Sequence, residues 1–171
     1  MPQFLVIIRG APASGKTTIA KEIRNYDQKI AWLKVDNFKD FFSDHAQPNE
    51  QKNVDECALA SLEYLLNNNF SVVMEKIFFD PFIIPKAIEA ASKRGILVKV
   101  FQLQTPLATL QERDKKRPGV KEGCRQPLGD DVIAKIYAQL EKTFYPGAIP
   151  LNTEELTLSE CVNVIRKSVR I

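Results

Sequence analysis

The sequence is poor in the residues that build zinc sites and disulfide frameworks. It has three cysteines among 171 residues, Cys57, Cys124 and Cys161, which lie far apart without a CxxC pair. Isolated cysteines in odd number are typical of a protein in a reducing compartment, so we expect a cytoplasmic location. His45 is the only histidine, and we expect it to be a surface residue.

Long apolar runs and a strong net charge are also missing. No apolar run approaches the ~20 residues that span a bilayer, and the N-terminal MPQFLVIIRG has neither the basic region nor the cleavage site of a signal peptide. The net charge of +3 permits phosphate-bearing ligands but does not by itself indicate nucleic-acid binding. The remaining composition, 44% hydrophobic and 26% charged, is typical of a soluble globular protein. We expect one domain over residues 1–171, monomeric or homodimeric, without a membrane partner.

Short apolar runs alternate with segments of helical periodicity along the chain. Strands are predicted at residues 4–8, 30–35, 70–74, 96–103 and 148–151, and helices at 16–26, 54–66, 85–93, 105–116, 130–140 and 158–169. Asp130 is the predicted cap of the fifth helix, and Thr157 with Glu160 forms a predicted capping box before the sixth. Strands separated by helices form a parallel sheet with right-handed crossovers and helices on both faces. The pattern therefore predicts an α/β protein of three layers, α/β/α.

Two stretches depart from this alternation. Residues 37–47 are irregular and aromatic. Residues 117–129 (RPGVKEGCRQPLG) contain three glycines and two prolines and have no periodicity. Such composition is typical of a loop between helices, either a plain surface connection or a lid over a site.

Residues 10–17 (GAPASGKT) match the phosphate-binding pattern GxxxxGK[ST] and lie between a predicted strand and a predicted helix. The glycines let backbone N–H groups turn inward towards phosphates, and the helix N-terminus adds partial positive charge. Lys16 is expected to contact the β- and γ-phosphates, and Thr17 to offer its hydroxyl to Mg²⁺. The predicted nucleotide contacts are Gly10, Ala11, Pro12, Ala13, Ser14, Gly15, Lys16, Thr17 and Thr18.

Other classes of P-loop protein fit less well. No NKxD-type guanine reader is present, which argues against a GTPase and makes ATP the default nucleotide. A motor ATPase needs a longer module with a helical lid domain. Of these classes of P-loop protein, the small nucleotide-kinase-like proteins fit the sequence best.

The chain resembles the small P-loop kinases that include polynucleotide kinase, chloramphenicol phosphotransferase, gluconate and shikimate kinases and zeta-toxin-like proteins. The resemblance runs from FLVIIRGAPASGKTTIAKEI through WLKVDNFKDFF, VVMEKIFFD and VFQLQTPLATLQERDKKRP to IPLNT. Its first segment is the most specific. The resemblance as a whole implies an AAA-type ATP-binding domain with a P-loop NTPase fold. It also implies a five-stranded parallel sheet in the order 2-3-1-4-5 and a lid at about residues 117–129.

The resemblance also implies roles for two acidic residues. In such kinases the second strand ends in an acidic residue that faces the acceptor hydroxyl, and Asp36 has this place. A carboxylate there can accept the hydroxyl proton; capping of the turn at residues 37–42 is the alternative role for Asp36. Glu75 follows the third strand, where an acidic residue would serve Mg²⁺. Its alternative is a structural salt bridge with Lys76, which stands where the family often has a small residue.

Similar kinases carry an RxxxR pair before the lid, and Arg113 and Arg117 match it. The first arginine commonly stacks on adenine, and the second contacts phosphate. Four-residue spacing predicts that both lie on one helix face. Arg125, inside the predicted lid, would complete a clamp on the γ-phosphate. For these arginines and for Lys121, a solvated surface position is the alternative.

The acceptor is the least determined part. Seven of the ten phenylalanines fall between residues 38 and 82, where they would either line an apolar acceptor pocket or pack helices on the sheet. We expect an ATP- and Mg²⁺-dependent transferase that phosphorylates a hydroxyl of a small molecule. A polynucleotide 5′-hydroxyl kinase, with a basic channel from Lys34, Lys39, Lys52 and Lys76, is one alternative. A nucleotide-gated regulatory NTPase without an acceptor is the other.

Overall fold

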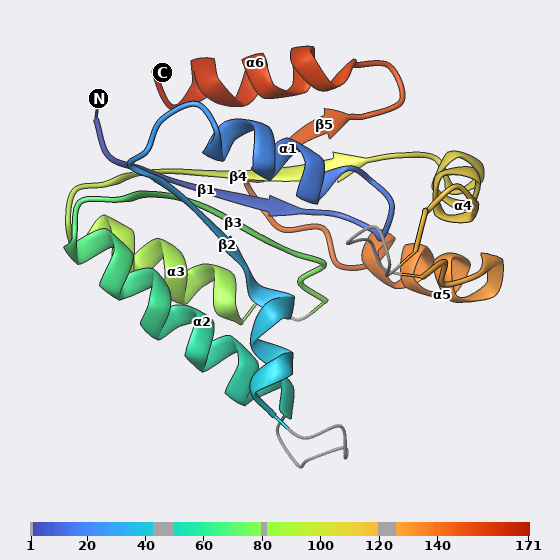
Figure 1. The fold of residues 1–171 in the computed structure, drawn as a ribbon, viewed down its shortest axis with the longest axis horizontal. Helices are drawn as coiled ribbons and strands as arrows, with labels where there is room; N and C mark the ends of the chain where they lie inside the picture. Colours follow the sequence, from blue (N-terminus) through green and yellow to red (C-terminus); the bar gives the residue numbers. More distant parts are fainter. Residues whose placement is uncertain (1, 43–49, 80–81, 120–125) are drawn as a thin grey trace.

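A five-stranded parallel sheet forms the centre of the computed structural model, which describes residues 2–42, 50–79, 82–119 and 126–171 (Figure 1). The strands are β1 (Phe4–Arg9), β2 (Ile30–Lys34), β3 (Ser71–Lys76), β4 (Leu97–Gln104) and β5 (Ile149–Asn152). Their spatial order is β2-β3-β1-β4-β5. The predicted P-loop fold and strand order are confirmed.

Helices cover both faces of this sheet. One face carries α1 (Lys16–Arg24) and α6 (Leu158–Ser168), and the other carries α2 (Glu50–Asn67) and α3 (Ile83–Ser92). The remaining helices, α4 (Leu107–Lys115) and α5 (Asp130–Glu141), lie together beyond one end of the sheet (Figure 1). Because all strands are parallel, this end is where their carboxyl ends meet, which is where doubly wound sheets bind ligands.

The central strand β1 is apolar on both sides because it is buried on both sides. Phe4, Val6 and Ile8 pack into the core beneath α1 and α6. Leu5 and Ile7 pack into the core above α2 and α3. Since strand side chains alternate between faces, the next residue, Arg9, points to the α2–α3 side. It is fully buried there.

Several predicted boundaries differ from those observed. The third strand extends through Glu75 and Lys76 and does not end at residue 74. The third helix begins at Ile83, so Pro85 lies in its first turn, where the missing N–H costs nothing. The N-cap of α5 is Gly129, and the prediction that Asp130 caps it was wrong; Asp130 is the first helical residue. The capping box of Thr157 and Glu160 is confirmed.

Two further expectations concern irregular and apolar segments. Part of the stretch predicted as irregular forms a 3₁₀ helix, η1 (Val35–Phe41), directly after β2. Within the described ranges, no helix has the length and apolar content that crossing a bilayer requires.

Candidate active site

The phosphate-binding loop joins β1 to α1 at the carboxyl edge of the sheet. A Cβ atom at Gly10 would lie 2.8 Å from Ser14 Oγ and 3.0 Å from Leu103 Cβ, so only glycine fits there. Gly15 has φ 98° and Ala13 has φ 63°. A positive φ at a non-glycine residue is strained, and such strain is concentrated at functional sites. The backbone therefore has the tight curvature that a phosphate cradle needs.

The lysine of the loop is buried and directed across it. Lys16 is 8% exposed, and its Nζ donates to the carbonyl oxygen of Ala11 at 2.8 Å. This hydrogen bond closes the loop upon itself and holds the charge at its mouth. The role of Lys16 in phosphate binding stays a prediction.

Thr17 and Glu75 meet behind the loop. Thr17 Oγ1 donates to Glu75 Oε1 at 2.8 Å, and Glu75 is 3% exposed. The described residues contain no group of three or more acidic, histidine or cysteine side chains that could hold a metal ion. One hydroxyl and one carboxylate nevertheless fit Mg²⁺, because that ion keeps several waters and takes further oxygens from substrate phosphates.

The alternative for Glu75, a salt bridge with Lys76, is wrong. Adjacent strand residues point to opposite faces of the sheet. Lys76 points towards α2, where its Nζ lies 2.5 Å from Asp55 Oδ1 and both side chains are almost fully buried. Glu75 points towards α1 and Thr17.

Asp36 lies near this pair at the same edge of the sheet. In the register of β2 and β3, Lys34 is opposite Glu75, and Asp36 follows two residues later in η1. Its side chain is 18% exposed and lies 3.7 Å from Lys39 Nζ. The N-cap of η1 is Lys34, so the alternative that Asp36 caps a turn at residues 37–42 is not supported.

Arg113 is held against the loop that follows β5. Its Nη2 donates to the carbonyl oxygen of Thr153 at 2.7 Å, and Nη1 donates to Thr153 Oγ1 at 3.2 Å. A cavity of about 440 Å³ lies here, lined by residues 13–15, 18–19, Arg113 and residues 153–158. This cavity adjoins the phosphate loop and is the candidate site for the nucleotide base. The sequence analysis assigned no role to residues 153–158, although the capping box signal marked the helix that follows them.

Arg117 does not share a helix face with Arg113. Helix α4 ends at Lys115, so Arg117 lies in the following turn, and the expectation of one common face is wrong. Its Nε lies 3.1 Å from Asp114 Oδ1. Arg125, Lys121 and His45 lie outside the described residues.

The phenylalanines divide between packing and exposure. Phe78 is buried in the α2–α3 core, and Phe38 and Phe42 pack against that core. Phe79 packs against the cluster of Ala11, Leu110 and Ile133 beside the phosphate loop. Phe41 is 73% exposed and contacts Phe38 edge to face. Most of the described rings therefore have structural contacts.

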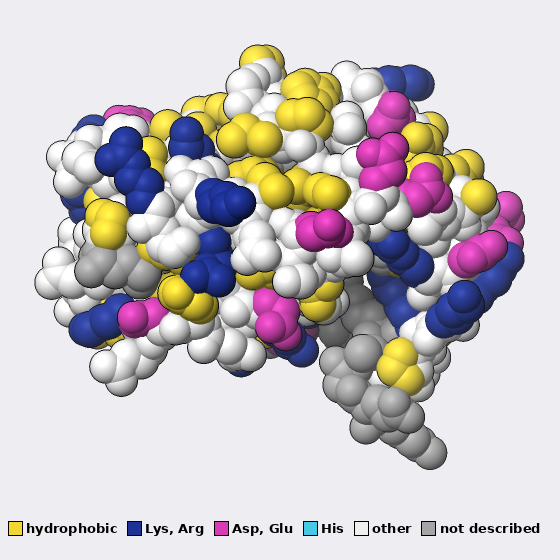
Figure 2. All heavy atoms as spheres, turned by 90° about the horizontal axis from the view of Figure 1, so that it is seen from above, with side chains coloured by type: hydrophobic (Ala, Val, Ile, Leu, Met, Phe, Trp, Pro, Cys, Tyr) yellow, Lys and Arg dark blue, Asp and Glu magenta, His cyan; other side chains and the backbone are white. Residues whose placement is uncertain are grey.

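The four lysines considered for a nucleic-acid channel have separate local contacts. Lys76 is paired with Asp55, Lys52 lies near Glu56, and Lys39 near Asp36; Lys34 lies over the ring of Trp32. On the face in Figure 2, Lys and Arg side chains (dark blue) are interspersed with acidic and apolar groups and do not form a continuous stripe.

Comparison with known proteins places this site in a family. The family model described as an AAA domain matches residues 5–143, which include the phosphate loop, Asp36, Glu75 and Arg113. Among curated proteins, none matches the sequence.

Solved structures share the fold at low sequence identity. A sugar kinase from Janibacter sp. superposes with a TM-score of 0.73 at 16% identity, over 99% of this chain and 96% of that chain. The tunicamycin resistance protein of Deinococcus radiodurans gives 0.70 at 15% identity, over 98% and 95%. A gluconokinase from Sinorhizobium meliloti gives 0.63 at 16% identity, over 99% and 90%.

Proposed function

Since this chain belongs to the AAA domain family, we propose that it is an ATP-dependent kinase that transfers the γ-phosphate to a hydroxyl group of a small molecule. Phosphotransfer in general is supported by the family and by the kinases that share the fold. The acceptor and the residue roles are our proposal.

The observation that carries it is the Thr17–Glu75 hydrogen bond beside Asp36. The hydroxyl of Thr17 donates its proton to Glu75 and so keeps its oxygen lone pairs available. When bound, Mg²⁺ would neutralise charge on the phosphates. Asp36, two residues beyond the position opposite Glu75, lies at the same edge of the sheet. A phosphate site, a metal-compatible pair and a carboxylate therefore share one edge of the sheet.

In this proposal Asp36 is the general base. The acceptor oxygen attacks the γ-phosphorus while its proton passes to the carboxylate of Asp36, and the bond between the γ-phosphorus and the bridging oxygen breaks, which releases ADP. Lys39 Nζ lies 3.7 Å from Oδ1 of that carboxylate and orients it before the acceptor binds.

Basic side chains would stabilise the charge that the transferred group carries. Lys16 has a place at the mouth of the loop, and Arg113 lines the candidate base site. We assign Arg117, at the start of the predicted lid at residues 117–129, and Arg125, inside it, to the phosphates in the closed state. Since the transition state needs positioning and charge neutralisation more than covalent chemistry, these groups suffice.

Two of the structural neighbours and the placement of the lysines support a small-molecule acceptor. Two of the compared structures are named as a sugar kinase and a gluconokinase, and these names support our proposal of a hydroxylated small molecule. The dispersed contacts of Lys34, Lys39, Lys52 and Lys76 do not favour a channel for a nucleic-acid end.

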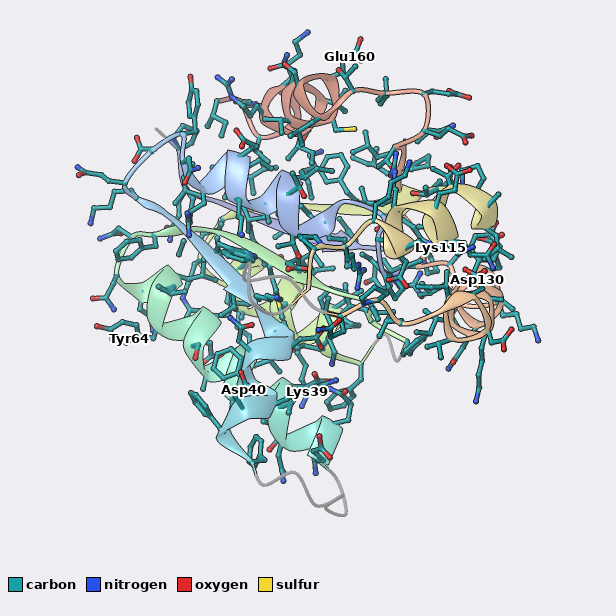
Figure 3. The ribbon with its side chains drawn as sticks, turned by 45° about the vertical axis from the view of Figure 1, so that its right-hand side comes forward. Lys39, Asp40, Tyr64, Lys115, Asp130 and Glu160 are labelled. Carbon is teal, nitrogen blue, oxygen red and sulfur yellow. The ribbon has the colours of Figure 1, made fainter. Side chains whose placement is uncertain are left out.

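Label transfer tests the proposal. The protein is incubated with Mg²⁺ and γ-labelled ATP against sugar acids, nucleosides, hydroxylated antibiotics and 5′-hydroxyl oligonucleotides. Transfer to one small acceptor should fall by at least about 10²-fold in Asp36→Asn and be lost in Lys16→Ala. Asp40→Asn is the matched control, because Asp40 lies exposed on the same 3₁₀ helix (Figure 3). Slow phosphate release that Asp36→Asn leaves unchanged would overturn the proposal.

A further inference from the structure

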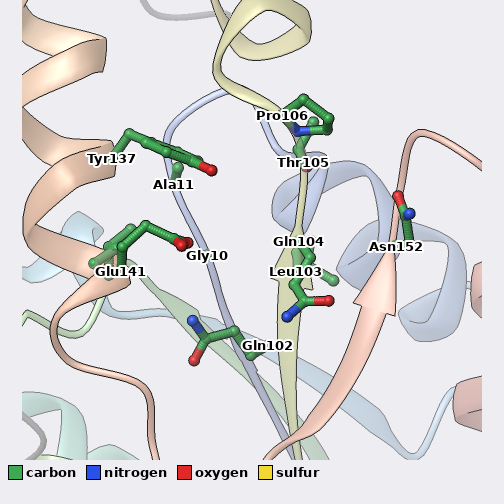
Figure 4. Close-up of a pocket in the computed structure, with 11 residues that line it drawn as sticks. Gly10, Ala11, Gln102, Leu103, Gln104, Thr105, Pro106, Tyr137, Glu141 and Asn152 are labelled. Atoms are coloured by element: carbon green, nitrogen blue, oxygen red, sulfur yellow. The ribbon is translucent and has the colours of Figure 1, made fainter.

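A second cavity, of about 320 Å³, lies beside the start of the phosphate loop, at Gly10 and Ala11 (Figure 4). Its walls are the carboxyl end of β4, one side of α5, Asn152 at the end of β5, and Gly10 and Ala11. It shares no lining residue with the cavity beside Arg113, and neither Asp36 nor Glu75 lines it. Its volume falls at the lower end of the roughly 300–1,000 Å³ of small-molecule pockets.

The floor of this cavity is a glutamine whose orientation is set by a buried arginine. Arg9 is fully buried, and desolvation lowers its pKa. Among the described residues it donates to the carbonyl oxygen of Phe78, to Gln102 Oε1 and to Thr143 Oγ1, all of them neutral. A guanidinium only donates, so Gln102 must turn its oxygen to Arg9 and its NH₂ group away from it. That NH₂ group is directed into the cavity (Figure 4).

A second amide is oriented in the same way. Asn152 Oδ1 accepts the backbone N–H of Glu154 at 2.9 Å and of Glu155 at 3.4 Å. Its oxygen is therefore occupied by the turn after β5, which leaves the NH₂ group as the donor that this lining residue can offer a ligand. Gln102 and Asn152 thus both present hydrogen-bond donors whose direction is determined by other contacts.

The facing wall supplies an aromatic ring and an acceptor. Tyr137 and Glu141, one turn apart on α5, extend from that helix towards β1 and β4 (Figure 4). Glu141 is the one charged residue that lines the cavity in the described part of the chain. The Glu141 carboxylate would repel an anion, whereas an ammonium group would face the N–H groups of Gln102 and Asn152. A hydroxyl group both donates and accepts hydrogen bonds, so it can donate to Glu141 on one wall and accept from Gln102 and Asn152 on the other.

We propose that this cavity is a second ligand site, which binds an uncharged polyhydroxylated molecule of about the size of a monosaccharide. The molecule donates hydroxyl protons to Glu141, accepts hydrogen bonds from Gln102 and Asn152, and lays the apolar face of its ring on Tyr137. The site is separate from the acceptor position beside Asp36. It does not depend on the proposed kinase activity, because binding there needs neither ATP nor Asp36.

The test is direct binding to the whole protein without nucleotide, measured by ligand-observed NMR and calorimetry. The neutral probes are glucose, galactose and myo-inositol. Glucuronate and glucosamine are matched charged probes on the same ring. We expect at least one neutral probe to bind at millimolar concentration, and glucuronate to bind at least about tenfold more weakly than glucose.

Gln102→Glu is the decisive variant. It keeps an acceptor for Arg9, so the protein should fold, but it replaces the donor in the cavity with a second carboxylate oxygen. We expect it to abolish binding of the neutral probe. Gln139→Glu, the same change at an exposed position of α5 outside the cavity, should leave binding intact. The proposal is overturned if no neutral probe binds, if Gln102→Glu binds as well as the parent, or if Asp36→Asn removes the binding.

Discussion

The guanidinium of Arg117 lies 3.1 Å from the buried carboxylate of Asp114. The second oxygen of that carboxylate accepts the N–H groups of Leu128 and Gly129, at 2.7 and 3.0 Å. One side chain at the end of α4 therefore holds both ends of the segment from residue 117 to residue 129. If Arg117 moves to the phosphates, as we propose, it must leave Asp114, whereas the bonds to Leu128 and Gly129 can remain.

The first prediction concerns this carboxylate. Asp114→Ala removes a buried carboxylate that accepts two backbone N–H groups and pairs with Arg117, so we expect the free energy of unfolding to fall by about 2–4 kcal/mol. Asp130→Ala is the control, since its ion pair with Lys115 is exposed (Figure 3) and should contribute about 0–1 kcal/mol. Denaturant unfolding of both variants decides the matter: equal losses would contradict a special role for Asp114.

The second prediction concerns Thr17. Thr17→Ala removes the hydroxyl and leaves the buried Glu75 without its hydrogen bond. We expect kcat to fall by at least about 10²-fold and the Mg²⁺ concentration for half-maximal activity to rise. Thr17→Ser keeps the hydroxyl and should stay within about tenfold of the parent. Should the alanine variant keep its magnesium requirement and its rate, the hydroxyl has no role at the metal.

The third prediction concerns Arg113. Its two hydrogen bonds to Thr153 place a planar guanidinium beside the candidate base site. Arg113→Ala should raise KM for ATP by about tenfold or more, and Arg113→Lys should not restore it, because an ammonium group has neither the planar face nor the fork of donors. The kinetic constants are measured with ATP as the varied substrate. A lysine variant with the parental KM would show that charge alone suffices.

The fourth prediction concerns pH. Hydrogen bonds from the Thr157 side chain and backbone lower the pKa of Glu160. A carboxyl group whose pKa is lowered in the folded state stabilises that state above its unfolded pKa, and the contribution is lost as the pH falls through the folded pKa. Glu160→Gln, which resembles the protonated side chain, should lower Tm at neutral pH (Figure 3 labels Glu160).

At a pH well below the lowered pKa of Glu160 in the folded state, the parent and Glu160→Gln should unfold at the same temperature, because the parental carboxyl is then protonated in both states. Glu155→Gln, an exposed carboxyl three residues after Asn152, is the control. A difference in Tm between parent and Glu160→Gln that persists unchanged in acid would show that the charge of Glu160 contributes nothing.

Local patterns in the sequence predicted the elements and the phosphate loop well. The continuous apolar run of β1, the glycines of the loop and the capping box of Thr157 and Glu160 act over a few residues, so their spacing is sufficient. The predicted boundaries of helices and strands were less accurate where the local sequence is compatible with two kinds of secondary structure. Residues 35–41 follow a strand without a helical apolar stripe, and only packing of Val35 and Phe38 on the α2–α3 core selects the 3₁₀ helix.

The pairing of charged side chains depended on the tertiary structure. The sequence by itself determined that Lys16, Thr17 and Glu75 lie at strand and helix ends on one edge of a parallel sheet. It did not determine that Lys76 pairs with Asp55, that Arg113 contacts Thr153, or that Arg9 orients Gln102 at the floor of a cavity. These partners are 21, 40 and 93 residues apart. Hydrogen bonds within a helix or turn follow from chain geometry, whereas contacts at such separation exist only after the helices have packed on the sheet.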